Sequence, residues 1–185
     1  MDEGCEVVPT LFLMVGLPGA GKTTLAKQIE KERGALRLTP DDWMHALGID
    51  LFDESMRSKI EALQWEISAR VLKIGRDVIL DFGFWSIGER EDYAARASEI
   101  GARVEICFLD LPMEDLRNRV RQRNDEGFVQ IDMELLDSYS ALFQPPTKEE
   151  VERLSELEFG TPPQVDKEPR QQARPFTVSL HDGTI

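Results

Sequence analysis

The sequence is poor in cysteine, and this shortage excludes a disulfide-stapled protein. Cys5 and Cys107 are its only cysteines among 185 residues. Cys5 stands in an acidic start and Cys107 in an apolar run, so we expect no disulfide between them. Their spacing also gives no pattern typical of a zinc site.

Basic residues are scarce as well. The chain has 22 Lys and Arg against 35 Asp and Glu, which gives a formal net charge of -13. Proteins that hold a long phosphate backbone usually carry a basic surface, so nucleic acid is an unfavourable partner here. A small phosphate compound, bound singly, suits this charge better.

Long hydrophobic runs are missing too. The longest, around LFLMVGL at residues 11–17, is far too short to cross a bilayer. The acidic start, MDEGCEVVPT, lacks the basic and then apolar layout of a signal peptide. These two features lead us to expect a cytoplasmic protein without a membrane span.

What is present indicates one α/β domain. Hydrophobic residues make up 41% of the chain, enough for a sizeable core at this length. Short apolar runs alternate with segments of helical periodicity, which predicts a parallel sheet of four to five strands flanked by helices. Strands are expected at 11–15, 35–39, 77–82 and 103–110, and helices at 22–33, 54–74, 86–100, 112–124, 132–142 and 148–157. An apolar stripe on the long helix is formed by Met56, Ile60, Leu63, Ile67 and Val71.

The domain is expected to span residues 1–159, followed by an arm at 160–185. The arm begins with GTPPQVDKEPRQQARP, which is rich in Pro, Gln and charge. The stretch FTVSL at 176–180 has strand composition and either adds a fifth strand or belongs to a loose terminus.

The segment GLPGAGKT at 16–23 matches the phosphate-loop pattern G-x-x-x-x-G-K-[ST], between a predicted strand and a predicted helix. Glycines allow backbone N–H groups to surround phosphate oxygens, and the following helix adds its dipole. Lys22 is placed to reach the β- and γ-phosphates of ATP, and Thr23 to ligate Mg²⁺. The candidate nucleotide-binding residues are Gly16, Leu17, Pro18, Gly19, Ala20, Gly21, Lys22, Thr23 and Thr24.

A phosphate loop alone is compatible with a phosphotransferase, a hydrolase motor or a switch. Asp81, at the end of the third strand, is a second candidate for the Mg²⁺ site, through water. The alternative is that this carboxylate caps a turn at the end of the strand.

Two adjacent acids in TPDDW, at 39–43, follow the second strand. Thr39 is a suitable N-cap, Pro40 suits the first helical position, and Asp42 then completes a capping box. This leaves Asp41 at the carboxyl end of a strand, where ligands of open α/β sheets bind. We therefore interpret Asp42 as structural and Asp41 as a base that accepts a hydroxyl proton.

The order of these motifs resembles one kinase group. The chain has a phosphate loop, an acid after the second strand, LDFGFWS after the third and an arginine-rich helix after the fourth. In this order of motifs it resembles the P-loop kinases that include polynucleotide kinase, zeta toxins and chloramphenicol phosphotransferase. The resemblance covers about residues 10–157. It implies that Asp41, the first acid of the pair, is the base. In polynucleotide kinase an arginine three residues later holds the acceptor's phosphate, but Met44 stands at that position here.

The helix after the fourth strand carries LRNRVRQRN at 116–124. Arg119 and Arg123 share one face, and Arg117 and Arg121 share another. By resemblance to kinase lids, we expect a short helical lid at about 112–130 that directs Arg119 and Arg123 toward the transferring phosphoryl group. The alternative is a solvated surface helix.

Aromatic residues near the two acids are candidates for an acceptor pocket. Trp43, Phe84 and Trp85 are expected to wall it, and Arg90 to bind the acceptor or a phosphate group. The alternatives are core packing for the aromatic residues and a surface charge for Arg90.

Together these residues predict an ATP-dependent, Mg²⁺-dependent kinase that phosphorylates a hydroxyl of a small molecule. An antibiotic, a sugar derivative and a nucleotide-like metabolite all remain candidate acceptors. The alternatives are a polynucleotide 5'-hydroxyl kinase, which requires a basic channel, and a non-catalytic ATP-binding module, which needs neither Asp41 nor the lid arginines.

Overall fold

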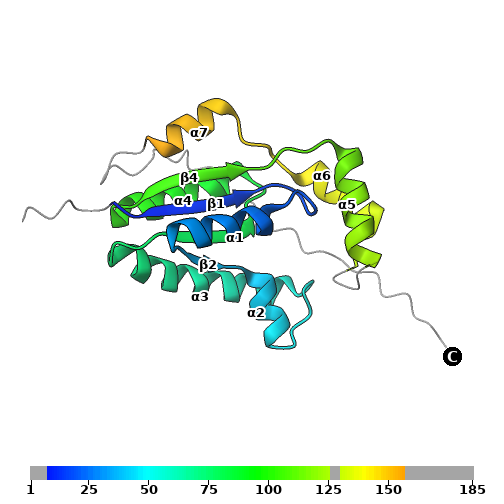
Figure 1. The fold of residues 1–185 in the computed structure, drawn as a ribbon, viewed down its shortest axis with the longest axis horizontal. Helices are drawn as coiled ribbons and strands as arrows, with labels where there is room; N and C mark the ends of the chain where they lie inside the picture. The colour runs from blue at the N-terminus through cyan, green and yellow to red at the C-terminus, as the bar shows by residue number, and fades with distance from the viewer. Residues whose placement is uncertain (1–7, 126–129, 157–185) are drawn as a thin grey trace, which may run out of the picture.

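A parallel sheet forms the centre of the molecule (Figure 1). The computed structural model describes residues 8–125 and 130–156, and within them the sheet has four strands in the order β2-β3-β1-β4. Their bounds are β1 Thr10–Val15, β2 Leu36–Leu38, β3 Val78–Gly83 and β4 Arg103–Phe108. Because β1 pairs with both β3 and β4, the segment that follows β1 leaves from the middle of the sheet. The predicted α/β class and parallel sheet are confirmed.

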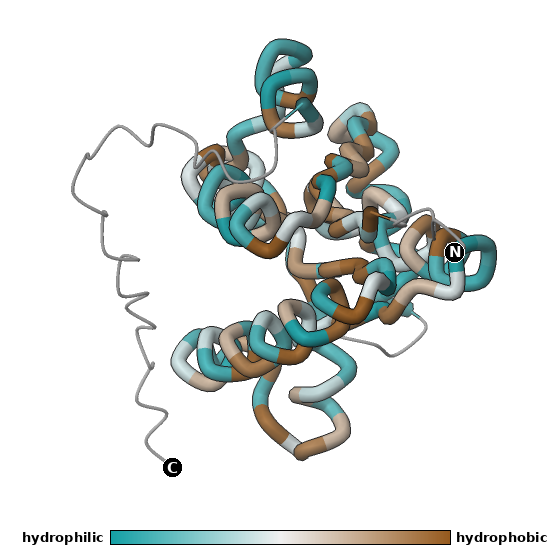
Figure 2. Tube along the Cα trace, turned by 90° about the vertical axis from the view of Figure 1, so that its left-hand side faces the viewer, coloured by the Kyte–Doolittle hydropathy of each residue, from teal (hydrophilic) through white to brown (hydrophobic). Residues whose placement is uncertain are grey.

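Helices cover both faces of the sheet. They are α1 Lys22–Arg33, α2 Pro40–Ala46, α3 Glu54–Lys73, α4 Ile87–Ile100, α5 Met113–Asp125, α6 Met133–Leu142 and α7 Lys148–Ser155. Successive side chains of a strand point to opposite faces. Thus Phe12 and Met14 of β1 pack with Ala26 of α1, whereas Leu11 and Leu13 share a core with α3, α4 and α7. Residues of β1 are all buried, and in Figure 2 the helical coils around the centre alternate between hydrophobic and hydrophilic residues.

A separate hydrophobic cluster joins α5 and α6 to the loop after β1. Leu116 and Val120 of α5 and Leu136 of α6 are buried there with Leu17 and Ala20. The predicted lid helix is therefore packed on the candidate phosphate loop. Residues 126–129 of the predicted lid, and the arm with its possible strand at 176–180, lie outside the described residues.

The buried face of α3 differs from the predicted apolar stripe. Leu63 is exposed, whereas Gln64 and Ser68 are buried. Gln64 Nε2 donates a hydrogen bond to the carbonyl oxygen of Thr39 at 3.1 Å, and Ser68 Oγ donates to the carbonyl oxygen of Gln64 at 2.7 Å. The Gln64 amide nitrogen thus ties α3 to the residue that precedes α2, whereas the Ser68 hydroxyl is bound within α3 itself. Within residues 8–125 and 130–156, no helix is long and apolar enough to span a bilayer.

Candidate active site

The phosphate loop connects β1 to α1 at the carboxyl edge of the sheet. Gly16, Gly19 and Gly21 all have positive φ angles, of 145°, 83° and 100°. A Cβ atom at Gly16 would lie 2.9 Å from the carbonyl oxygen of Leu109. At Gly19 it would lie 3.0 Å from Val120 Cγ2 of α5. These glycines are required by the backbone conformation and by the close approach of neighbouring segments.

The first helical turn after the loop has its backbone N–H groups free of a side-chain cap. Gly21 is the N-cap of α1 and has no side chain to accept from these groups. Thr23 and Thr24 are exposed on this turn. An uncapped helix N-terminus preceded by a glycine-rich loop suits phosphate oxygens, so the loop fits the predicted nucleotide.

Lys22 lies with its side chain over the loop. Its Nζ donates to the carbonyl oxygen of Leu17 at 3.0 Å. Burial lowers the pKa of Lys22 to about 8, although the carboxylates of Asp81 and Asp41 act in the opposite direction. Arg123 lowers this pKa further, which places its charge within electrostatic range of Lys22. A bound polyphosphate would add negative charge beside this amine and favour its protonated form.

Thr23 and Asp81 meet directly. Thr23 Oγ1 donates to Asp81 Oδ2 at 2.8 Å, and Asp81 is only 7% exposed. Burial raises the pKa of Asp81, whereas the Thr23 hydrogen bond and Lys22 lower it. A hydroxyl and a carboxylate beside the phosphate loop fit Mg²⁺, which usually keeps water and phosphate oxygens among its ligands. Consistent with this sparse donor set, residues 8–125 and 130–156 contain no group of three His, Cys, Asp or Glu that could hold a metal.

The structure separates the two adjacent acids, and it corrects the predicted capping box. Thr39 is the N-cap of α2, but its side chain makes no capping hydrogen bond. Its hydroxyl instead donates to the carbonyl oxygen of Asp81 at 3.4 Å, because the start of α2 packs against β3. Asp42 pairs with Arg37 of β2 at 2.9 Å. Asp42 is therefore structural through an ion pair and not through a cap.

Asp41 has a different partner. Its Oδ1 accepts from Arg57 Nη2 of α3 at 2.6 Å, and its side chain is 51% exposed. Its charge raises the pKa of Lys22, so the carboxylate is within electrostatic range of that amine. Asp41 thus lies at the same edge of the sheet as the phosphate loop, on the side of α2 and α3.

The arginines of α5 divide between two environments. Arg119 Nη1 donates to the carbonyl oxygen of Ala20 in the phosphate loop at 3.4 Å, and Arg123 acts on Lys22 as described above. Arg117 instead pairs with Asp137 of α6 at 2.7 Å, and Arg121 Nη1 donates to Asn118 Oδ1 at 3.2 Å. The structure therefore brings Arg119 and Arg123 to the phosphate loop and directs Arg117 and Arg121 away from it.

Phe84, one of the three aromatic residues predicted to line the acceptor pocket, lies in the hydrophobic core. It is 4% exposed and stacks on Phe82, with ring centroids 5.5 Å apart. Its side chain belongs to the main core cluster and also contacts the ring of Tyr93, with ring centroids 5.1 Å apart. The prediction that Phe84 lines a pocket is wrong for this reason. Trp43 packs partly against the same core, and Trp85 lies 4.6 Å from Tyr139 of α6.

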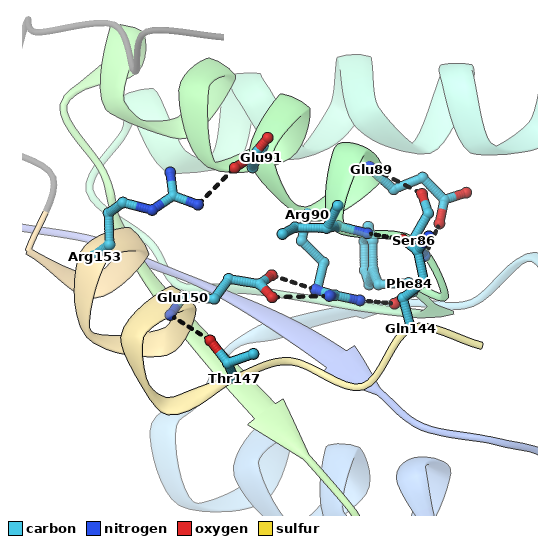
Figure 3. Close-up of polar contacts among 10 residues, drawn as sticks. Phe84, Ser86, Glu89, Arg90, Glu91, Gln144, Thr147, Glu150 and Arg153 are labelled. Atoms are coloured by element: carbon cyan, nitrogen blue, oxygen red, sulfur yellow. Dashed lines mark hydrogen bonds and ion pairs between the residues drawn. The ribbon is translucent and has the colours of Figure 1, made fainter. Parts of the chain in front are cut away.

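Arg90 also has a role different from the predicted one (Figure 3). It is fully buried, and its Nε and Nη2 donate to the two carboxylate oxygens of Glu150 in α7 at 2.6 and 3.0 Å. Its Nη1 donates to the carbonyl oxygen of Phe84 at 3.0 Å. A guanidinium so occupied and enclosed has no access to an acceptor. Arg90 therefore fixes α7 and the turn after β3 instead of binding substrate.

Sequence reasoning did not identify three residues within electrostatic range of Asp41, of which Arg57 contacts it directly. Arg57 pairs with its carboxylate, Glu61 lies 3.9 Å from Arg57, and Tyr139 is near enough for Asp41 to raise its pKa. Burial raises the pKa of Glu61 to about 7, against the lowering effect of Arg57. No spacing or motif marks these residues, because they come from α3 and α6 and meet α2 only in the folded chain.

Comparison with known proteins agrees with this geometry. A family model described as an AAA domain matches residues 11–146, which is well over half of the chain. The chain belongs to this family. The AAA domain match includes the phosphate loop, both acids and the arginines of α5, and it ends before α7. Among curated proteins, no sequence matches the chain.

Solved structures of kinases and related proteins share the fold of this AAA domain. A chain in the Pnkp1/Rnl/Hen1 RNA repair complex is similar at a TM-score of 0.65 and 22% identity, covering 93% of this chain and 53% of that one. Kti12 from Chaetomium thermophilum, in complex with ADP-AlF3, is similar at a TM-score of 0.58 and 19% identity, covering 75% of this chain and 82% of that one. A sugar kinase from Janibacter sp. is similar at a TM-score of 0.53 and 21% identity, covering 76% of this chain and 80% of that one. The chain spans about half the length of the first relative, and the predicted P-loop kinase fold is confirmed.

Proposed function

We propose that the protein is an ATP-dependent phosphotransferase that moves the γ-phosphoryl group of ATP to a hydroxyl of a small molecule. The observation that carries the proposal is the convergence of Lys22, Asp81 and Asp41 at one edge of the sheet. The carboxylates of Asp81 and Asp41 both lie within electrostatic range of Lys22, where they raise its pKa against the effect of burial. A module that only binds nucleotide has no need of a half-exposed carboxylate there.

Each residue has a defined part in this reaction. The loop amides and Lys22 hold the phosphates, as the ADP-AlF3 bound to the similar Kti12 makes reasonable for this loop. Thr23 and, through water, Asp81 would hold Mg²⁺, which when bound neutralises charge on the phosphate oxygens. Arg119 and Arg123 offset the charge that develops on the transferring group.

In the proposed reaction, Asp41 accepts the proton that the acceptor hydroxyl loses. The acceptor hydroxyl oxygen forms a bond to the γ-phosphorus, and the bond from that phosphorus to the bridging oxygen breaks, so ADP leaves with that electron pair. The hydroxyl proton passes to the Asp41 carboxylate, which serves as general base. Trp43 and Trp85, both partly buried near α2 and α6, are proposed to contact the acceptor.

A screen of hydroxyl compounds tests this function. We expect ADP release above the ATP-only background for at least one antibiotic, sugar derivative or nucleotide-like compound, with Mg²⁺ present. The variant Lys22→Ala should lose this turnover while its circular dichroism spectrum stays unchanged. If calorimetry finds no affinity for Mg²⁺-ATP at millimolar nucleotide in the intact protein, the proposal is wrong.

A polynucleotide 5'-hydroxyl kinase is the second candidate. The similarity to a chain of an RNA repair complex, which covers 93% of this chain, favours it. The net charge of -13 and the complete burial of Met44, where polynucleotide kinase has a phosphate-binding arginine, oppose it. A 5'-hydroxyl oligonucleotide therefore belongs in the same acceptor screen.

A further inference from the structure

We infer that Arg57 is the residue that positions Asp41 for proton transfer. This inference rests on the proposed function, in which Asp41 is the base. It concerns a residue that no sequence motif marks, on a helix that starts thirteen residues after Asp41.

Arg57 is the better anchored member of the ion pair. Its side chain is 21% exposed, against 51% for Asp41. Its Nη2 donates to Asp41 Oδ1 at 2.6 Å and also to the carbonyl oxygen of Leu51 at 3.4 Å, and its Nη1 lies 3.9 Å from Glu61 Oε1. Three oxygens from α2, from the loop before α3 and from α3 itself therefore surround one guanidinium. A group held in this way orients the more exposed carboxylate, instead of being oriented by it.

The hydrogen bond from Arg57 occupies only one of the two carboxylate oxygens of Asp41. Arg57 bonds to Oδ1, and Asp41 Oδ2 makes no hydrogen bond to any of the residues that the structure describes. A general base needs one oxygen free toward the proton and a fixed orientation of the other. In this geometry Oδ1 of Asp41 is fixed by Arg57, and Oδ2 is the oxygen that would accept the proton.

The neighbouring acid shows that this arrangement is specific to Asp41. Asp42 pairs with Arg37 of β2, so the two adjacent carboxylates are drawn to different elements. The two arginines thus hold adjacent residues of α2, a helix of only seven residues, from β2 and from α3. Of the two, Asp41 is the one whose charge acts on Lys22.

Single-turnover ATP hydrolysis tests the inference, because water then serves as the acceptor and no other compound is required. Arg57→Ala should slow the rate about 10- to 100-fold, the cost of a misplaced catalytic group, with the affinity for ATP, measured by calorimetry, unchanged. Arg57→Lys, which keeps the charge, should recover part of the loss. Arg70→Ala, the same change at an exposed position of the same helix, should leave the rate unchanged. If Arg57→Ala does not fold, Arg57→Met, which keeps most of the apolar stem and removes the charge, replaces it in the comparison.

A double-mutant cycle separates the outcomes. If Arg57 acts through Asp41, the variant Asp41→Asn/Arg57→Ala should be no slower than Asp41→Asn alone. A double variant slowed by the full additional factor would overturn the inference and assign Arg57 an independent role, such as binding the acceptor. A wild-type rate in Asp41→Asn would instead overturn the base in the proposed function and the inference with it.

Discussion

At the scale of single residues, Asp41 and Asp42 form a matched pair of tests. We expect Asp41→Asn to slow phosphoryl transfer about 10²–10⁴-fold, because it removes a positioned base, and to leave ATP affinity nearly unchanged. Asp42→Asn loses the ionic part of its contact with the largely buried Arg37 but keeps an oxygen that accepts a hydrogen bond, so it should change the free energy of unfolding by about 1 kcal/mol. Single-turnover rates and calorimetry measure the first effect, and urea unfolding measures the second. An essential Asp42 beside a dispensable Asp41 would reverse the assignment.

Lys22 gives a second test at this scale, through pH. Burial lowers its pKa to about 8, so above that pH the free protein loses the proton of this amine. Bound phosphates favour the protonated amine, so nucleotide binding should take up protons above pH 8 and weaken as the pH rises further. Calorimetry at pH 9 in two buffers of different ionisation enthalpy measures this uptake. The variant Lys22→Arg, whose side chain stays charged, should show none, and an absence of uptake in the wild-type protein would contradict the prediction.

At the scale of elements, α5 presents two faces with different expected effects. Arg119 and Arg123 face the phosphate loop, so replacing either by Ala should slow transfer about 10²-fold, more than it weakens ATP binding. Arg117 and Arg121 bond to Asp137 and Asn118, and their Ala variants should stay within a few-fold of the wild-type rate. Single-turnover rates for the four variants decide this. Four equal and small effects would show that α5 is only a charged surface helix.

The attachment of α7 predicts a large effect on stability from one substitution. Glu150 neutralises the buried guanidinium of Arg90 (Figure 3), so Glu150→Ala should lower the free energy of unfolding by about 3–5 kcal/mol. Glu152→Ala removes an exposed carboxylate of the same helix and should change it by less than about 0.5 kcal/mol. Urea unfolding compares the two variants. Equal losses of stability would mean that the buried pair does not hold α7.

At the scale of the whole molecule, the net charge gives a prediction about the two proposed acceptor classes. A chain with a formal charge of -13 should repel nucleic acid, so fluorescence anisotropy should show no saturable binding of a 5'-hydroxyl RNA up to about 10⁻⁴ M at physiological salt. Binding of Mg²⁺-ATP in the same buffer is the control. Tight RNA binding that weakens steeply with added salt would favour the polynucleotide kinase.

The features that the sequence determined by itself are those encoded in contiguous residues. Residues 16–23 specify a strand end, glycine conformations and a helix start in one short segment, and the structure has α1 beginning at Lys22 as predicted. Alternation of strands and helices was sufficient for the parallel sheet, because right-handed crossovers leave few other arrangements. The spacing of the α5 arginines separated their two faces, since residues four apart lie on the same side of a helix.

Only the tertiary structure decided which distant side chains meet. Arg90 and Glu150 are 60 positions apart, and nothing local to either indicates that burial would pair them. The same holds for Arg57 beside Asp41, and for Phe84, which follows β3 and packs in the core. Pairing of charges and choice of buried face depend on packing between elements, where the cost of an unpaired buried charge exceeds any local preference.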